Sequence, residues 1–296
     1  QVSNGMGNIL AGTVTIDGNN MFAGGTSAGV YYTSNFGANW VQTTLNNQLV
    51  FALINSGSNV LAGTFNAGTF RSTNNGASWN QVTMGGNMTV WAYCFSGSNI
   101  FAGTFCPLVA NMGVYRSTDN GVSWSLAGVN NREVRSLASF GNYIYAGTID
   151  SGVFISTNSG VNWSKSSLNN RNVRSLTVNG NFVFAGILNA QGVFKSTDYG
   201  NTWVQSFSNN NDCNALDMMG STVIAGTISN GVYVSNDNGA NWLQKNEGLS
   251  HLSVFALKIY NGFVYAGTSG GGVYKRPLSD LIGISQISEI IPLKYS

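Results

Sequence analysis

Charge is the first thing that this sequence lacks. The 296 residues include 13 Lys and Arg against 11 Asp and Glu, which gives a formal net charge of +2. The positive field that attracts a phosphate backbone is therefore missing, and we do not expect nucleic-acid binding. No apolar run approaches the roughly 18 residues of a membrane-spanning helix, so no membrane span is expected. The composition also excludes a coiled coil and a polyelectrolyte tail.

Histidine and cysteine are scarce as well, with one His and three Cys. A single histidine, His251, excludes a His-rich metal site, and no Ser-His-Asp or Cys-His arrangement can be read from the chain. Cys94 and Cys106 flank a hairpin expected around Gly97, which places Cys106 closer to Thr89 than to Cys94. At about 3.3 Å per residue they are too far apart to form a disulfide. We expect three free, mostly buried thiols, no bound metal and no cofactor.

Glycine, in contrast, is abundant, with 38 residues against three prolines, and part of it belongs to an internal repeat. An Ala-Gly dipeptide that follows a large apolar residue recurs at steps of 39, 40, 44, 39, 40 and 41 residues. A Gly-Val-Tyr tripeptide or a close variant follows each dipeptide. A fixed period of this length is typical of solenoids and propellers. The seven dipeptides begin at Ala23, Ala62, Ala102, Ala146, Ala185, Ala225 and Ala266.

Each unit contains four short β-branched or aromatic runs, separated by Gly, Asn, Asp and Ser, without a helical period. In the fifth unit the runs are 172–178, 181–187, 192–196 and 202–206. Four strands of about five residues and their turns fill about 40 residues, as the spacing requires. One such meander leaves both faces apolar, so the units must stack around an axis. The sequence predicts an all-β, seven-bladed β-propeller of four-stranded antiparallel blades over residues 1–276.

The two ends of the repeat indicate how the ring closes. The last unit supplies three strands and then runs into Arg276 and Pro277 without a fourth. The opening Gln1-Val2-Ser3 is similar to Val41-Gln42-Thr43, which is expected to form a fourth strand elsewhere. We therefore predict that the N-terminal strand completes the C-terminal blade, which removes two unpaired edges. Residues 277–296 would then form a C-terminal tail.

A turn motif, Ser/Thr-x-Asp/Asn-x-Gly-x-x-Trp, stands between the third and fourth strands of six units. Its Asp or Asn can accept hydrogen bonds from backbone N–H groups two residues on, its Gly supplies a positive φ, and its Trp buries a ring beside the turn. The spaced oxygen ligands and the terminal Glu of a calcium-binding EF-hand loop are missing, so a structural role is predicted. The Asp or Asn positions are Asn35, Asn74, Asp119, Asn158, Asp198 and Asp237.

These six motifs resemble the Asp-box (BNR) repeats of a propeller family that includes sialidases, sortilin-type receptors, some xyloglucan hydrolases and a photosystem assembly factor. The resemblance covers residues 1–276 and implies that the box is a folding element away from the ligand face. The segments Arg276–Asp280 and Ser288–Pro292 are similar to the linker that joins such propellers to a C-terminal type IX secretion sorting domain. With Gln1 where a signal peptide could have been removed, the resemblance implies a secreted, extracellular protein trimmed at both ends.

At one position the repeat stops being regular. It lies in the first strand of each unit, two residues before the central apolar residue, toward the mouth of the central channel, where propellers usually bind ligands. The loops that enter units four and five add Arg132 and Arg171 to this rim. Aromatic surface beside guanidinium groups suits an acidic glycan or a peptide carboxylate. Alternatively, Val-Arg-Ser-Leu is only a repeat consensus whose Arg stems cover the blades. The irregular position holds Gly12, Phe51, Trp91, Arg135, Arg174, Asn214 and Phe255.

Three functions are compatible with this pattern. The leading hypothesis is an extracellular, non-catalytic binding or assembly module, whose partner is a glycan, protein or peptide at the cell surface or in the extracellular matrix. The second is a glycosidase of the sialidase or xyloglucanase type, for which Glu133, Asp150 and Asp212 are the candidate carboxylates. The third is a structural subunit of an extracellular lattice or filament that self-associates through the tail at 277–296. The regular repeat and the few ionisable groups at the mouth favour the first.

Overall fold

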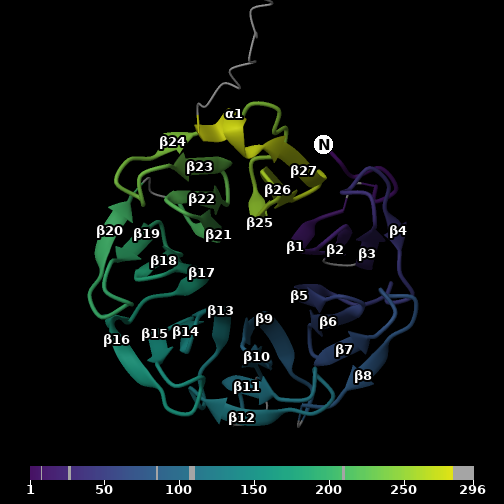
Figure 1. Ribbon diagram of the computed structural model, residues 1–296, viewed down its shortest axis with the longest axis horizontal. Helices are drawn as coiled ribbons and strands as arrows, with labels where there is room; N and C mark the ends of the chain where they lie inside the picture. Colours follow the sequence, from purple (N-terminus) through teal and green to yellow (C-terminus); the bar gives the residue numbers. More distant parts are fainter. Residues whose placement is uncertain (8, 26–27, 85, 107–110, 209–210, 283–296) are drawn as a thin grey trace, which may run out of the picture.

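The computed structural model describes residues 1–7, 9–25, 28–84, 86–106, 111–208 and 211–282. These residues form 27 β-strands and one short α-helix, and the strands are grouped in seven antiparallel sheets. The sheets stand as blades around a central axis, in chain order, as Figure 1 shows. The predicted seven-bladed β-propeller is therefore confirmed. Within the same residues, no helix has the length and hydropathy that a membrane crossing requires.

Six blades have four strands, and in each of them the chain meanders from the innermost strand to the outermost (Figure 1). Blades 1 to 3 consist of β1 (Ala11–Asp17), β2 (Asn20–Gly25), β3 (Gly29–Thr33), β4 (Val41–Gln42), β5 (Val50–Ser56), β6 (Asn59–Thr64), β7 (Thr69–Ser72), β8 (Asn80–Val82), β9 (Thr89–Ser96), β10 (Asn99–Phe105), β11 (Val114–Ser117) and β12 (Ser125–Gly128). Blades 4 to 6 consist of β13 (Val134–Phe140), β14 (Tyr143–Thr148), β15 (Gly152–Ser156), β16 (Ser164–Asn169), β17 (Val173–Asn179), β18 (Phe182–Ile187), β19 (Gly192–Ser196), β20 (Val204–Phe207), β21 (Cys213–Met219), β22 (Thr222–Thr227), β23 (Val232–Ser235) and β24 (Leu243–Gln244). Blade 7 and the helix after it consist of β25 (Val254–Tyr260), β26 (Phe263–Thr268), β27 (Gly272–Pro277) and α1 (Leu278–Ile282).

The hydrophobic core lies between the blades. It consists of seven clusters of buried side chains. Six of them join two neighbouring blades, and the seventh joins blade 3 to Met84 and Met88 of the loop that precedes it. In one of them, Phe101 and Val114 of blade 3 pack with Ile144 and Ala146 of blade 4. Because a single blade covers neither of its own faces, the apolar surface leaves water only when the blades stack in a ring.

The Ala-Gly repeat marks the closest approach between blades. A Cβ atom at Gly63, on β6, would lie 2.8 Å from the side chain of Val90 in the following blade. Side-chain carbons do not come this close in a packed interior, so only glycine fits there. A Cβ atom at Gly267, on β26, would clash with the backbone oxygen of Ala11, so blade 7 packs on blade 1 through the same contact. The dipeptide that reveals the repeat is thus the contact that spaces the blades.

The turn motif of blade 3 shows how an Asp box is held together. Asp119 accepts a hydrogen bond from the backbone N–H of Ser123 (2.9 Å), and the Ser117 hydroxyl donates to its carboxylate (2.7 Å). The N–H of Gly121 donates to the same Ser117 hydroxyl (2.8 Å). The carboxylate reaches four residues on, where two were expected, because Asn120 and Gly121 both take a positive φ and curl the backbone around it.

These donors lower the pKa of the Asp-box carboxylates. Hydrogen bonds from the hydroxyl and the backbone N–H of Ser123, and from Ser117, lower the pKa of Asp119 to about 2. The pKa values of Asp198 and Asp237 are lowered in the same way, with the residue four positions on as the main donor. Hydrogen bonds to the charged form stabilise it, so these carboxylates stay ionised well into acid.

The tryptophan rings of the Asp boxes lie in the core clusters between blades. The indole N–H of Trp79, Trp124 and Trp203 donates to the glycine of the same box, whereas that of the other three tryptophans reaches the preceding blade. The indole N–H of Trp163 donates to the backbone oxygen of Ala127 on β12 (3.1 Å), and that of Trp40 donates to the backbone oxygen of Val2 (2.8 Å). Six of the seven core clusters formed by the described residues include one such ring. An Asp box therefore closes a turn in its own blade and seals the interface with the blade before it.

The N-terminal residues close the ring beside β27, where Figure 1 places the N-terminus. The N–H of Val2 donates to the backbone oxygen of Val273 (2.8 Å), and Nε2 of Gln1 donates to the backbone oxygen of Gly271 (2.7 Å). The predicted closure by the N-terminus is confirmed, although blade 7 itself has three paired strands. The N-terminal segment takes the place of its fourth strand through this short contact instead of a full ladder.

The chain beyond the last blade begins as part of the fold. β27 includes Arg276 and Pro277, which the sequence analysis placed after the last strand, and α1 follows directly. Leu278 and Leu281 of α1 are buried in the same cluster as the side chains of β23. The first residues of the predicted tail therefore pack on blade 6. The remainder of that tail, 283–296, with the self-association expected of it, lies outside the described residues.

All three cysteines, Cys94, Cys106 and Cys213, are buried and free. The β9–β10 register pairs Phe105 with Thr89, so Cys106 follows on the side of the hairpin away from Cys94, as predicted. Burial raises the pKa of the Cys94 and Cys213 thiols to about 12. Thiols that stay protonated at neutral pH are poor nucleophiles, so these two residues serve packing.

Candidate functional site

A β-bulge interrupts the innermost strand of every blade at the same place. In β13, Val134 pairs with Thr148 and Ser136 pairs with Gly147, which leaves Arg135 as the extra residue between two ladder pairs. A bulge bends the strand and re-aims the side chain of the extra residue. The bulge residues are the seven residues of the irregular position, namely Gly12, Phe51, Trp91, Arg135, Arg174, Asn214 and Phe255.

These bulges lie where the innermost strands begin, at one mouth of the central channel. Because strand direction alternates across each blade, the Asp-box turns between the third and fourth strands lie at the opposite face. A cavity of about 220 Å³ occupies the channel, and Arg135, Arg174, Asn214 and Phe255 are among the residues that line it. Four of the predicted ligand-binding residues therefore share one space.

Residues from four consecutive blades gather around the indole of Trp91 at this mouth. The ring of Phe51 lies 4.4 Å from the indole, measured between centroids. The guanidinium carbon of Arg135 lies 4.6 Å from the indole centroid, and that of Arg174 lies 5.6 Å from it. Cation–π contacts of this kind hold charged groups beside an apolar surface. Four of the residues that the sequence assigned to the mouth, Phe51, Trp91, Arg135 and Arg174, thus form a single cluster.

The cluster has two positive charges, on Arg135 and Arg174, but only one negative charge beside them, on Glu133. Nε of Arg135 donates a 2.7 Å hydrogen bond to Glu133, whose side chain is only 10% exposed. Arg174 has no carboxylate partner among the described residues. Burial lowers the pKa of Arg174 to about 10, and the charge of Arg135 adds to this effect while Glu133 opposes it. Two guanidinium groups share one carboxylate, so an additional anion here would be stabilised.

Two buried donors at the mouth have no hydrogen-bond partner among the residues that the structure describes. They are Nε1 of Trp91 and Nδ2 of Asn214. A buried donor without an acceptor costs roughly 1–3 kcal/mol. A ligand rich in oxygen supplies an acceptor to the guanidinium of Arg174, which has no carboxylate partner among the described residues. The mouth is therefore suited to hold an acceptor-rich, negatively charged group against an aromatic surface.

The other two predicted arginines point elsewhere. Nη1 of Arg132 lies 3.3 Å from the carboxylate of Asp150, and both side chains are exposed. Nη1 of Arg171 donates to the side-chain oxygen of Gln191 (2.7 Å), and its guanidinium lies 5.4 Å from the ring of Phe194 on β19, two strands out from the channel. Neither side chain contacts the aromatic cluster, so the four arginines do not converge on one point.

The three candidate carboxylates of a glycosidase are each engaged by a different neighbour. Glu133 pairs with Arg135, Asp150 with Arg132, and Asp212 accepts a hydrogen bond from the backbone N–H of Ala190 (2.8 Å). Glycoside hydrolysis needs two carboxyl groups about 5–10 Å apart that flank one bond. As the structure has them, these groups stabilise arginines and a loop.

Phe65 is a residue of this site that the sequence analysis missed. Its ring packs edge-on against Phe51 with centroids 6.1 Å apart, and it is 43% exposed. It extends the aromatic surface toward solvent. The available signal was its place directly after the Ala-Gly-Thr that ends β6 at the mouth. Elsewhere on blade 7, Nδ1 of the exposed His251 lies 3.1 Å from the hydroxyl of Tyr274.

Comparison with known proteins gives one family match and many similar folds. Residues 115–126, the Asp box of blade 3, match the family model described as the BNR/Asp-box repeat. No curated protein sequence matches the chain significantly. The matched segment contains Ser117, Asp119, Gly121 and Trp124, the four residues that build the turn. The chain thus carries the Asp-box repeat on a seven-bladed propeller.

Three solved structures illustrate the likeness. YCF48 from Cyanidioschyzon merolae is 13% identical with a TM-score of 0.73, and the match covers 93% of this chain and 97% of that one. The GH74 xyloglucanase from Xanthomonas campestris is 14% identical with a TM-score of 0.75, covering 94% and 53%. The extracellular domain of BT4673 from B. thetaiotaomicron is 17% identical with a TM-score of 0.72, covering 92% and 39%. The chain thus spans about half or less of the last two proteins. At such low sequence identities, the TM-scores show a shared fold and nothing further.

Proposed function

We propose that this propeller is an extracellular, non-catalytic binding module whose ligand, a glycan or a peptide bearing a carboxylate, docks at the channel mouth. The observation that carries the proposal is the pair Arg135 and Arg174 over the indole of Trp91, with Glu133 as the one carboxylate for both. A ligand carboxylate fits the free guanidinium. The flat apolar face of a sugar ring or of a side chain fits the aromatic surface.

Two of the similar structures support this choice. YCF48, 13% identical in a second structure with a TM-score of 0.72, has a D1 peptide bound, and the BT4673 domain is extracellular. Export through the type IX secretion system is part of the proposal, supported by the similarity of Arg276–Asp280 to a linker that precedes a sorting domain.

A binding panel of acidic glycans and carboxylate-bearing peptides tests the proposal. We expect the double variant Arg135→Ala/Arg174→Ala to weaken binding by roughly 10- to 100-fold, since charge-assisted hydrogen bonds are lost. The matched control is Arg132→Ala/Arg171→Ala, which removes the same charge from the same blades but not from the aromatic cluster, and should change affinity less than about twofold. Equal losses in both variants would indicate nonspecific attraction and refute the site.

A glycosidase is the second candidate, favoured by the likeness to the GH74 xyloglucanase. It requires that xyloglucan or a sialylated substrate be hydrolysed and that Glu133→Gln or Asp150→Asn abolish turnover. We expect no turnover by the wild-type protein in such a panel. Hydrolysis that depends on either carboxylate would replace the binding proposal.

A further inference from the structure

The interface between blades 6 and 7 differs from the other six. The core cluster at this interface, within the part of the chain that the structure describes, contains no tryptophan. Blade 7 has no Asp box. Arg276 stands opposite Val264 on β26, at the register position where Ser235, the first residue of the sixth box, stands opposite Val223. A long cation thus replaces the hydroxyl that begins the turn in the other units.

Helix α1 fills part of the space that an indole fills elsewhere. Leu278 and Leu281 are buried in one cluster with Val234 of β23. Val234 has the same register position in blade 6 as Ile155 in blade 4. The cluster around Ile155 includes Trp203, the Asp-box tryptophan of the following blade. Two leucines therefore fill only part of the space that the repeat gives to one large aromatic ring.

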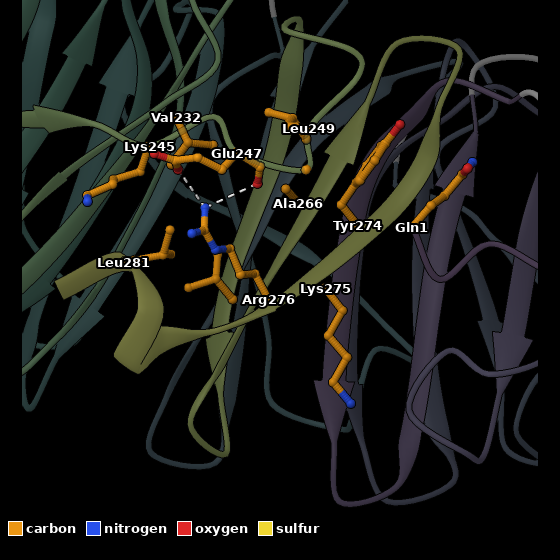
Figure 2. Close-up of a pocket in the computed structure, with 12 residues that line it drawn as sticks. Gln1, Val232, Lys245, Glu247, Leu249, Ala266, Tyr274, Lys275, Arg276 and Leu281 are labelled. Carbon is orange, nitrogen blue, oxygen red and sulfur yellow. Dashed lines mark hydrogen bonds and ion pairs between the residues drawn. The ribbon is translucent and has the colours of Figure 1, made fainter. Parts of the chain in front are cut away.

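A pocket of about 290 Å³ remains between blade 6, blade 7 and α1. Figure 2 shows Arg276 and Ala266 from blade 7, Leu249 from the loop between β24 and β25, and Leu281 from α1 around this space. Tyr274 lies on the side toward Gln1. An apolar cavity of roughly 150 Å³ accepts one benzene ring. The pocket therefore has room for two fused rings.

The charged groups of Arg276 and Glu247 at the pocket edge already pair with each other, and the ammonium groups of Lys245 and Lys275 point away from this pair (Figure 2). Nη1 of Arg276 donates to the carboxylate of Glu247 (2.8 Å) and to its backbone oxygen (3.1 Å), as the dashed lines in Figure 2 mark. Nε of Arg276 also lies 4.0 Å from the carboxylate of Asp280. A ligand that fits here does not need a charge of its own. The chemistry that remains to be satisfied is apolar contact.

We propose that this pocket binds a neutral aromatic ring of the size of indole, in the place where the other six interfaces hold an Asp-box tryptophan. Leu249, Leu281 and the ring of Tyr274 supply the contact surface. The site lies in the outer part of the ring of blades and shares no lining residue with the cavity of the channel mouth. It is independent of the function proposed above.

Titration of the whole chain with free indole, followed by ligand-observed NMR, tests the proposal. We expect saturable binding with a Kd of roughly 1 mM or below. Leu281→Trp and Leu249→Trp each place an indole of the protein in the pocket, and at least one folded variant of the two should bind the probe tenfold more weakly. Leu243→Trp is the control, because Leu243 is 65% exposed on β24 and its substitution leaves the pocket open.

The converse experiment creates an equivalent pocket between blades 5 and 6. Trp242→Ala empties the equivalent place between blades 5 and 6, so it should bind two indole molecules and regain melting temperature when indole is added. N-acetyl-tryptophanamide serves as a second probe: its binding indicates a polypeptide side chain as the ligand, whereas binding of indole alone indicates a free aromatic compound. No saturable binding to the wild-type chain, or unchanged binding in folded Leu281→Trp and Leu249→Trp, would overturn the proposal.

Discussion

The two faces of the propeller follow different rules. On one face, six turns repeat nearly the same residues, because backbone donors fix the Asp or Asn and a glycine presses on the preceding blade. On the other face, seven residues share one backbone bulge, yet their side chains range from none at Gly12 to indole at Trp91 and guanidinium at Arg174. Packing between blades dictates the residues in the turns, whereas the bulge directs the side chain of the extra residue toward the channel mouth, where the repeat does not fix its identity. In a repeat protein, the position where regularity stops is thus the position that can acquire function without changing the fold.

The largest expected effect is the loss of stability caused by Gly160→Ala, a substitution in the Asp-box turn of blade 4. Gly160 has a φ of 80°, and a Cβ there would clash with the ring of Phe101 in blade 3. Strained backbone and overpacking together should lower the free energy of unfolding by about 3–5 kcal/mol in chemical denaturation. The matched control is Gly141→Ala, at a φ of 58° with open space around it, which should cost only about 1–2 kcal/mol. Equal losses at the two glycines would mean that contact between blades does not select the residue.

An effect of intermediate size is expected on the melting temperature at acidic pH. The folded-state pKa values of Asp119, Asp198 and Asp237 lie below the value of about 3.9 for an unfolded chain. Their contribution to stability is therefore present above about pH 4 and is lost as the pH falls through the folded values, near 2 for Asp119. The triple Asp→Asn variant copies the boxes of blades 1, 2 and 4, where Asn accepts the same backbone bond. Calorimetry should show a smaller decrease in melting temperature between pH 4 and 2 for this variant; parallel curves would contradict the assignment.

The smallest expected effect is a gain of stability at the mouth. A lowered pKa of Arg174 means that folding disfavours its charged form, so at neutral pH the charge opposes folding. Arg174→Met keeps an apolar chain beside Trp91 and should raise the melting temperature by about 1–2 °C while it weakens ligand binding. Arg132→Met, at an exposed ion pair, should leave the melting temperature within about 1 °C. A decrease in Arg174→Met would show that stacking on the indole outweighs burial of the charge.

The sequence predicts most of the architecture because its signals are local and repeated. Each Ala-Gly dipeptide corresponds to one contact between blades, so counting dipeptides counts blades. Ring closure by Val2 was also visible, since its segment is similar to other fourth strands. Helix α1 was not predicted because five residues are too few to show a helical period. The helix packs at the interface where a seventh Asp box would place its tryptophan. The sequence shows that this box is missing but not what replaces it.

The candidate site was predictable in part. The irregular position identified all seven bulge residues, but it did not reveal that Arg135 and Arg174 share the indole of Trp91, because that contact joins three blades. The sequence also grouped Arg132 and Arg171 with them. Those two side chains pair with residues 18 and 20 positions further on, in loops whose geometry no periodicity encodes. Charge counting cannot separate arginines that differ only in loop conformation.

The Ala-Gly contacts have a consequence for recognition. Because the seven blades contact one another closely through glycine, they have little freedom to shift. The diameter of the channel and the positions of the groups around its mouth are therefore fixed before a ligand binds. The protein then gives up little conformational freedom on complex formation. Related ligands should accordingly differ mainly in their dissociation rates, whereas their association rates should be nearly the same.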